Sequence, residues 1–565
     1  MRRRKSGLTR TDDDDRPVRV DEELVDSADH ADIVPGSVRR RRRVIGHKAG
    51  NAVDRGGDRD NDESVTSQPA APANPWRALW ALCIGFFMIL VDSTIVSVAI
   101  RDIMGDLNAD INAVIWVTSA YLLAYVVPLL ITGRLGDKYG PKRVYMVGLV
   151  VFTASSLWCG LTDSVEMLIL ARVVQGLGAA AMTPQTMAVI TRIFPPDRRG
   201  AAMGMWGAVA GIATLVGPII GGLLVDGFGW EWIFFINVPV GLIALVLAWR
   251  LVPRLETHPR SFDWLGVVLS ACGLFLLVYG IQQAHGVEWG ALIGPITVPF
   301  VIGGGIVFLI AFVLWQRFTR AEVLVPLSLF KDRNFSLAAI AMTTVGFGVT
   351  SMAFPIMLWA QTVLGYTPTQ SALLLAPMAI LSGVLAPFVG RLVDHGSPRV
   401  LAGIGLGSFS AALFWLGAIL DSGTSLWAVI PPVLLLGVAN GFMWAPISST
   451  ATRNLPLHYA GAGSGVYNTV RQVGAVLGSA AIAVAMESRL EANIGSSSGM
   501  AGGAGAEAGA ESGAGAAGGM SGGLPDSIAS GFAHAMGQSL WVPAALVLIG
   551  FVAVLFFERP KARVR

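Results

Sequence analysis

An acidic residue, Asp92, lies in the middle of the apolar run FMILVDSTIVSVAI (87–100). An ionised carboxylate in a membrane core costs roughly 2.5–3.5 kcal/mol on insertion scales unless it is paired, hydrated or protonated. Apolar surroundings favour the protonated form, so such a group can bind a proton and release it again. We predict that Asp92 exchanges protons in competition with a cationic ligand, aided by the hydroxyls of Ser93, Thr94 and Ser97. A structural hydrogen bond to a neighbouring helix is the alternative.

Two arginines, Arg172 and Arg471, also fall inside apolar segments, where each needs an anion or a carbonyl group as partner. A clamp between helices is one role open to Arg172. For Arg471, fixing of a helix and lining of a cavity both remain open. Further side chains that could line an internal cavity for amphipathic ligands are Gln361, Asn440, Trp444 and Asn468.

The segment LVGPIIGGLL (215–224) combines a proline with small residues. Pro218 frees a backbone carbonyl and bends a helix. Gly217 and Gly221 form a small-xxx-small face for close packing, and Gly222 extends it. The pattern predicts a hinge or a seal against ion leakage, and simple helix packing is the alternative.

A short motif occurs twice, as GRLGDKYGPKR (133–143) and as GRLVDHGSPR (390–399). Two such turns point to two related halves, which is typical of transporters with alternating access. The acids can cap a helix or pair with arginines, and this favours a latch that closes in one state over a merely basic loop. The residues concerned are Gly133, Arg134, Asp137, Gly140 and Arg143 in the first turn and Gly390, Arg391 and Asp394 in the second.

The composition, with 53% hydrophobic and 14% charged residues among 565, is too apolar for an ordinary soluble protein. A span needs about 20 apolar residues. We therefore predict an all-α polytopic membrane protein with fourteen transmembrane helices. The predicted spans are 78–100, 112–132, 143–161, 165–188, 200–224, 232–252, 262–284, 291–315, 335–361, 369–389, 399–420, 425–448, 462–486 and 539–557.

The basic residues of the connecting segments set the orientation. With the N-terminus inside, the inner segments hold 21 Lys and Arg residues, and the outer ones hold Arg101 and Arg489 only. By the positive-inside rule both termini are cytoplasmic, and we expect a multi-pass plasma-membrane protein.

Several classes of function are disfavoured. The sequence has no Gly-x-x-x-x-Gly-Lys-Ser/Thr phosphate loop and no histidine cluster with metal spacing. We expect no enzyme activity and so no catalytic residue. We also expect no cofactor, no metal and no nucleic-acid partner; the partners are a small molecule, protons and the bilayer. We expect the monomer to be functional.

Together the motifs resemble the major facilitator superfamily, in its fourteen-span drug:proton antiporter branch, over residues 76–560. The first turn is similar to the signature loop of that superfamily, and LVGPIIGGLL is similar to its antiporter motif. VDSTIVSVAI (91–100) resembles the span-one motif, with Asp92 and Thr94 matching. ARVVQGLGAA (171–180) resembles the span-four motif, with Arg172 and Gln175 matching.

WEWIFFINVPVG (230–241) and GAGSGVYNTVRQVG (461–474) resemble two further landmarks of the family. The chain departs from the family at Ser97 and Arg101, where Asn and Pro are usual, and at Glu231, where Arg is usual. The resemblance implies that Arg172 takes part in proton coupling.

The resemblance also implies two six-helix bundles with two inserted spans. The expected parts are a disordered charged cytoplasmic tail (1–75), an N-terminal bundle (76–255), the inserted spans (256–320), a C-terminal bundle (321–560) with a flexible external Gly/Ala-rich loop (487–538), and a cytoplasmic end (561–565).

The expected function is a proton-coupled antiporter that exports drug-like or toxic small molecules by alternating access. Two alternatives remain open. One is a dedicated exporter of a single endogenous metabolite or siderophore, and the other is a membrane sensor or scaffold that does not transport.

Overall fold

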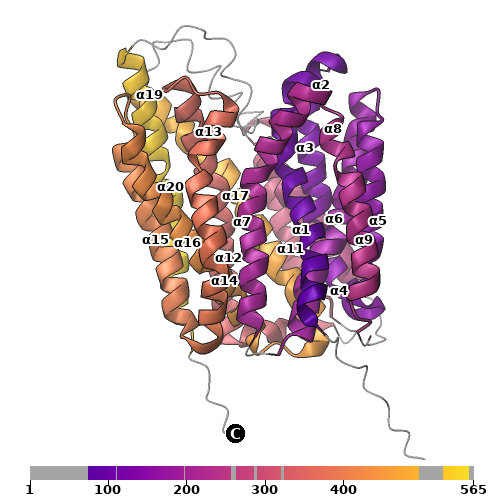
Figure 1. Ribbon diagram of the computed structural model, residues 1–565. Helices are drawn as coiled ribbons and strands as arrows, with labels where there is room; N and C mark the ends of the chain where they lie inside the picture. The colour runs from indigo at the N-terminus through magenta and orange to yellow at the C-terminus, as the bar shows by residue number, and fades with distance from the viewer. Residues whose placement is uncertain are drawn as a thin grey trace, which may run out of the picture. The chain divides into compact units, whose positions relative to one another are not determined.

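The computed structural model describes residues 74–109, 111–195, 198–255, 257, 263–284, 289–319, 323–494 and 526–558, which are mostly helical (Figure 1). All of them belong to one unit, Ser67–Arg565. The predicted tail, apart from residues 74 and 75, and the predicted end at 561–565 lie outside the described residues.

The helices fall into three groups along the chain. The first group is α1 (Pro75–Ile95), α2 (Ile100–Asp106), α3 (Ile111–Val126), α4 (Leu129–Tyr139), α5 (Pro141–Gly160), α6 (Val165–Ile193), α7 (Arg199–Phe228), α8 (Trp232–Phe235) and α9 (Asn237–Leu251). The second is α10 (Trp264–Gln283) and α11 (Val298–Phe318). The third is α12 (Arg333–Thr362), α13 (Pro368–Leu374), α14 (Ala376–His395), α15 (Pro398–Ile419), α16 (Leu426–Arg453), α17 (Ala460–Ile494), α19 (Asp526–Ser539) and α20 (Trp541–Leu555). Short 3-10 turns occur at η1 (Val96–Val98), η2 (Leu327–Lys331) and η3 (Leu457–Tyr459).

Each of the fourteen predicted spans corresponds to one of these helices or to a consecutive pair. Within the described residues, thirteen helices are long and apolar enough to cross a membrane, and up to fourteen if the bent pair Trp116–Val126 and Leu129–Tyr139 is one span. The two parts of that pair meet at 45°. In lipid every backbone polar group must be satisfied within the protein, and helices achieve this within one segment.

Prolines lie at several of the breaks between consecutive helices. Pro128 lies in the gap between α3 and α4, and Pro239, Pro377 and Pro543 each follow the last residue of the preceding helix by three or four positions. A proline lacks the N–H group and its ring clashes with the carbonyl four residues earlier, so the helix is interrupted there.

The predicted external loop 487–538 is wrong at both ends. Helix α17 continues to Ile494 and α19 begins at Asp526. Hydropathy fell at Glu487, Arg489 and Glu491, but these residue types favour helix once the segment leaves the apolar layer. Residues 495–525, the middle of the loop, lie outside the described residues.

The inserted helices α10 and α11 pack against each other and are joined by the short antiparallel strands β1 (Ala291–Ile293) and β2 (Ile296–Thr297). Asp263 fixes the pair: its carboxylate caps the N-terminus of α10 through Gly266 N (2.9 Å) and accepts from Trp315 Nε1 (2.9 Å) and Gln316 Nε2 (2.6 Å) on α11. Helix α10 also contacts α3 and α17, so the inserted pair lies against both halves.

The first and third groups, called here the first and second halves, meet chiefly along α7, which contacts α14 and α16, and along α17, which contacts α4 and α6. Helix α7 packs beside α14 (Figure 1), and α4 packs beside α17. The close approaches of Gly200 to Gly390 and of Gly133 to Gly461 lie at the end of the bundle at which α1 begins and the α4–α5 and α14–α15 turns occur. This end is predicted to be cytoplasmic and is called the basic end below.

Candidate functional site

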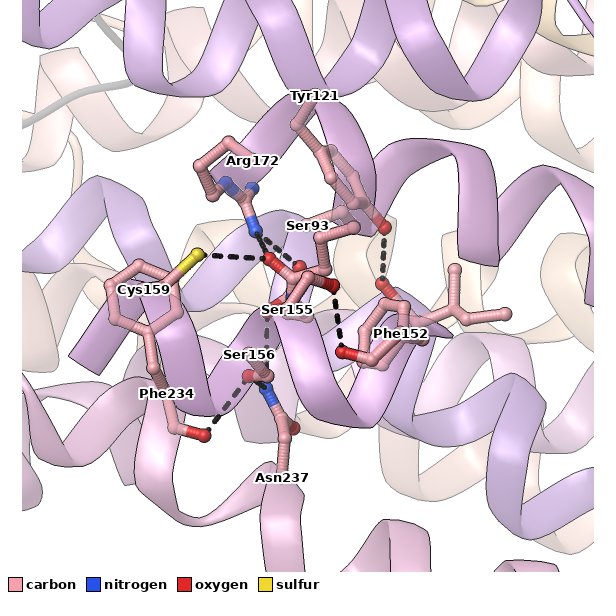
Figure 2. Close-up of polar contacts among 12 residues, drawn as sticks. Ser93, Tyr121, Phe152, Ser155, Ser156, Cys159, Arg172, Phe234 and Asn237 are labelled. Carbon is pink, nitrogen blue, oxygen red and sulfur yellow. Dashed lines mark hydrogen bonds and ion pairs between the residues drawn. The ribbon is translucent and has the colours of Figure 1, made fainter. Parts of the chain in front are cut away.

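The carboxylate of Asp92 accepts three hydrogen bonds inside the first half. Arg172 Nη1 donates to Oδ2 at 2.6 Å, and Gln175 Nε2 and Asn237 Nδ2 donate to Oδ1 at 2.9 and 3.1 Å. Figure 2 shows Arg172 and Asn237 on opposite sides of this cluster. The sequence suggested hydroxyl partners for this carboxylate at Ser93, Thr94 and Ser97, but packing of α1 against α6 and α9 brings it three other donors. These donors stabilise the ionised form.

The guanidinium of Arg172 has partners besides Asp92. It donates from Nη1 to Gln175 Oε1 (2.7 Å) and from Nε to the Val117 carbonyl (3.3 Å). Its centre lies 4.0 Å from the ring centroid of Tyr121, a cation–π distance. Arg172 is fully buried, and its Nη2 has no hydrogen-bond partner among the described residues. Arg172 is therefore held in place by groups that do not depend on Asp92.

Asn237 is oriented by a second layer of contacts. Its amide also contacts Ser156 Oγ (3.1 Å), and that hydroxyl donates to the Phe234 carbonyl (3.0 Å), next to the break between α8 and α9 (Figure 2). Cys159 Sγ donates to Gln175 Oε1 (3.7 Å). Residues of six helices, α1, α3, α5, α6, α8 and α9, thus take part in the network around this carboxylate.

This arrangement can exchange a proton only by rearrangement. Protonation of Asp92 removes the charge that Arg172 neutralises, while Arg172 keeps Gln175, Val117 and Tyr121. The cost of an unpaired buried arginine is thereby reduced in the protonated state. Asp92 itself is 0% exposed, so proton access requires the surrounding helices to move.

At the basic end, Asp137 of the first half caps a helix of the second. Its Oδ1 and Oδ2 accept from the N–H groups of Gly461 (2.8 Å) and Ala462 (2.9 Å) in the first turn of α17. Arg192 pairs with it at 2.7 Å, and Arg134 Nη1 lies 3.9 Å away. A carboxylate at a helix N-terminus satisfies N–H groups that have no partner within the helix.

Asp394 makes the reciprocal contact. Its Oδ1 and Oδ2, from α14 of the second half, accept from the N–H groups of Gly200 (2.7 Å) and Ala201 (3.1 Å) in the first turn of α7. Each repeated motif therefore caps the N-terminus of a helix in the opposite half, and the two caps have the same geometry.

Glycines allow these helices to approach closely. A Cβ added at Gly133 would lie 2.6 Å from the Gly461 carbonyl, and one at Gly390 would lie 2.8 Å from the Gly200 carbonyl. Gly140 has a φ of +91°, a conformation that favours glycine, and it precedes Pro141 at the start of α5. The remaining motif residues, Arg143 and Arg391, are exposed.

Comparison with known proteins identifies the architecture. Residues 82–479 match the family model of the Major Facilitator Superfamily. The uncharacterised MFS-type transporter Rv1250 of Mycobacterium tuberculosis is 50% identical over 483 residues, 86% of this chain and 81% of that protein. The chain belongs to the major facilitator superfamily.

Two further similarities agree with this family. The tetracenomycin C resistance and export protein of Streptomyces glaucescens is 36% identical over 439 residues, 76% of this chain and 80% of that protein. The solved structure of the proton:xylose symporter XylE bound to 6-bromo-6-deoxy-D-glucose has a TM-score of 0.59 at 13% identity, covering 86% of this chain and 96% of that one. The likeness to XylE concerns the fold alone. The predicted all-α major facilitator fold is confirmed, and the chain is a multi-pass membrane transporter.

In this major facilitator transporter, the Gly-Pro segment of α7 packs against α1. A Cβ at Gly217 would collide with Thr94 Oγ1, and one at Gly221 would lie 2.8 Å from Ile95 Cγ1. Thr94 donates to the Val91 carbonyl (3.1 Å). Gly222 faces Thr369 of the second half, and α7 remains one helix through Pro218.

The predicted cavity residues lie on three helices of the second half. Trp444 Nε1 donates to Asn440 Oδ1 (2.5 Å) on α16, and Asn468 Nδ2 donates to the Ser464 carbonyl (2.9 Å) on α17. Among the described residues, Gln361 Nε2 and Asn468 Oδ1 have no hydrogen-bond partner. Arg471 has none at Nε or Nη2.

The sequence reasoning missed Asn237, Ser156 and Tyr121 as members of the Asp92 cluster. Asn237 was visible as an amide inside the apolar segment IFFINVPVG, which is the signal that singled out Asp92. Ser156 and Tyr121 carried no such signal, because both residue types are common in membrane helices. Within the described part of the chain, no group of three or more His, Cys, Asp or Glu side chains could hold a metal ion.

Proposed function

We propose that this transporter is a proton-coupled antiporter that exports drug-like or antibiotic small molecules by alternating access. The proposal places it in the plasma membrane as a functional monomer with both termini in the cytoplasm. The observation that carries it is the fully buried Asp92, held by Arg172, Gln175 and Asn237. Such an acid inside a membrane is a functional candidate by default.

Helix α7 offers a route from proton binding to gating. Asp92 and Thr94 are two residues apart on α1, and Thr94 packs against Gly217 of α7. The other end of α7 begins at the cap provided by Asp394. In our proposal, protonation of Asp92 shifts α1 against α7, and α7 then separates from α14 at the basic end. This would open the site toward the cytoplasm.

Reconstituted vesicles with an imposed pH gradient test the proposal. We expect gradient-driven movement of tetracenomycin C or of compounds from a chemically diverse toxic panel. Asp92→Asn should abolish this movement while membrane insertion stays normal. Asp421→Asn, which removes an exposed carboxylate outside the cluster, is the matched control. Unchanged transport with an unchanged pH profile in Asp92→Asn would remove Asp92 from the mechanism.

A second candidate is a dedicated exporter of one compound. The Streptomyces glaucescens relative, which bears the name of a single compound, supports it. A growth screen of expressing cells against the same toxic panel separates the candidates, because a dedicated exporter protects against one compound only. Membership of a transporter family counts against a sensor or scaffold.

A further inference from the structure

Arg471 is a charged side chain without a counter-charge. It lies on α17 at roughly 16 Å from Ala460, given a rise of 1.5 Å per residue, and is therefore far from the helix end. The side chain is partly buried, and its Nε and Nη2 atoms have no hydrogen-bond partner among the described residues. No salt bridge to Arg471 is described either.

The described helices of the second half supply no other acid at this depth. On α12, α14, α15, α16, α17 and α20, every other Asp, Glu, Lys and Arg lies within eight residues of a helix end. In the first half, Asp92 and Arg172 cancel each other. The middle of the described bundle therefore carries one excess positive charge, on Arg471.

The surroundings of Arg471 are polar and incompletely satisfied. Asn468 precedes it by three residues and so shares its face of α17. Asn468 is fully buried, yet its Oδ1 has no partner among the described residues. Tyr467, one turn before Arg471, donates to Met342 Sδ on α12 (3.1 Å). Ser448 of α16 lies close to the Tyr467 hydroxyl, which places the Trp444–Ser448 turn next to this part of α17.

A row of aromatic side chains leads from this turn into the first half, from Trp444 on α16 to Trp206 on α7 and Phe86 on α1. Trp444 and Trp206 are 6.4 Å apart edge-to-face, and Trp206 stacks on Phe86 at 4.8 Å. Trp206 is buried, and its Nε1 has no hydrogen-bond partner among the described residues. A flat aromatic ligand could insert between these rings and replace their ring–ring contacts with its own, so that little buried apolar area would be lost.

Resting on the proposed function, we infer that Arg471 anchors a site for an amphipathic aromatic anion, such as a carboxylate or a phenolate. A bound anion would supply the partner that the guanidinium lacks and would form a charge-assisted hydrogen bond. A cation would meet only positive charge, because both oxygens of Asp92 already accept from the protein and its side chain is 0% exposed.

Two dyes with the same ring system and opposite charge test this inference. Purified full-length protein in lipid nanodiscs is titrated with fluorescein, an anion, and with rhodamine 123, a cation, and binding is followed by fluorescence anisotropy. We expect fluorescein to bind at least tenfold more tightly. Arg471→Gln should weaken fluorescein binding by about 10–100-fold, the size of one hydrogen bond to a charged group.

Two variants act as controls. Arg471→Lys keeps the charge and should retain most of the affinity. Arg489→Gln makes the same change at an exposed arginine of the same helix and should bind as the parent does. Size-exclusion chromatography of each variant verifies folding. Absence of fluorescein binding, tighter binding of rhodamine 123, or equal fluorescein binding by folded Arg471→Gln overturns the inference.

The binding assay needs no proton gradient, so the two proposals fail separately. Loss of charge preference with intact gradient-driven export overturns this inference alone. Retained fluorescein binding without any gradient-driven movement overturns the proposed function.

Discussion

The two halves of the bundle agree at the basic end and differ in the middle of the membrane. At the basic end Asp137 caps α17 and Asp394 caps α7, with two backbone N–H groups each. In the middle, the first half encloses the paired Asp92 and Arg172, whereas the second half has Arg471 without an acid.

This difference separates two tasks. Closure of one end requires both halves to form the same contact, so the repeated motif is kept in both. Chemistry in the middle has no such requirement. In our proposals, the first half holds a proton site whose charges cancel while its carboxylate is ionised, and the second holds a charged side chain for a ligand. Substitutions at the buried ion pair, at the caps and at an exposed acid should therefore differ in their effect on stability.

The largest loss of stability is expected when the ion pair of the first half is broken, so that this half also holds a buried charge without a counter-charge. Arg172→Gln leaves the buried carboxylate of Asp92 without its counter-charge and should destabilise the protein by about 3–5 kcal/mol. Thermal unfolding and the yield of inserted protein measure this loss. The double variant Asp92→Asn with Arg172→Gln should recover much of it. A single variant as stable as the parent would show that the pair is not needed for folding.

A smaller effect is expected at the caps, where the halves are alike. Asp137→Asn removes the charge that Arg192 and two N–H groups contact, a loss of about 2–3 kcal/mol. Asp394→Asn should lose about 1–2 kcal/mol, since Asp394 is only partly buried. Amide hydrogen exchange should rise at residues 461–462 in the first variant and at 200–201 in the second. If amide exchange stayed unchanged at both pairs of residues, Asp137 and Asp394 would not act as helix caps.

The smallest effect is expected away from both the basic end and the middle of the bundle, at Asp421 in the loop between α15 and α16. The Ser422 N–H group, and then the Ser530 hydroxyl and nearby His534, hold the pKa of Asp421 below its usual value. A lowered pKa stabilises the fold above the ordinary carboxylate pKa, and this contribution is lost only as the pH falls below about 4. Asp421→Asn should therefore change the free energy of unfolding by less than about 0.5 kcal/mol at pH 7. A larger loss would show that exposed charge matters as much as buried pairing.

The sequence was sufficient for the spans, because a run of apolar residues long enough to cross a bilayer has few other stable forms. It failed at Ile494 and Asp526, because the helices extend into polar sequence in which hydropathy does not show where a helix ends.

The sequence indicated several of the residues that belong to the candidate site, but it did not indicate which of them contact one another. Asp92 and Arg172 stood out as charges in apolar segments, but the sequence could not tell that they pair with each other across 80 positions. That pairing depends on how α1 and α6 pack, and so does the recruitment of Asn237. The repeated acids indicated a latch, but only the structure shows that each one contacts the opposite half.

The neutrality of the Asp92 cluster has an electrical consequence. While the carboxylate is ionised, the cluster has no net charge, and the transmembrane voltage exerts almost no force on it. Once a proton binds, the same cluster carries one positive charge, which is worth about 2.3 kcal/mol per 100 mV if it crosses the full field. In the proposed proton-coupled cycle, a cell interior held negative would then draw only the loaded form inward, and the cycle would keep its direction even with equal pH on both sides.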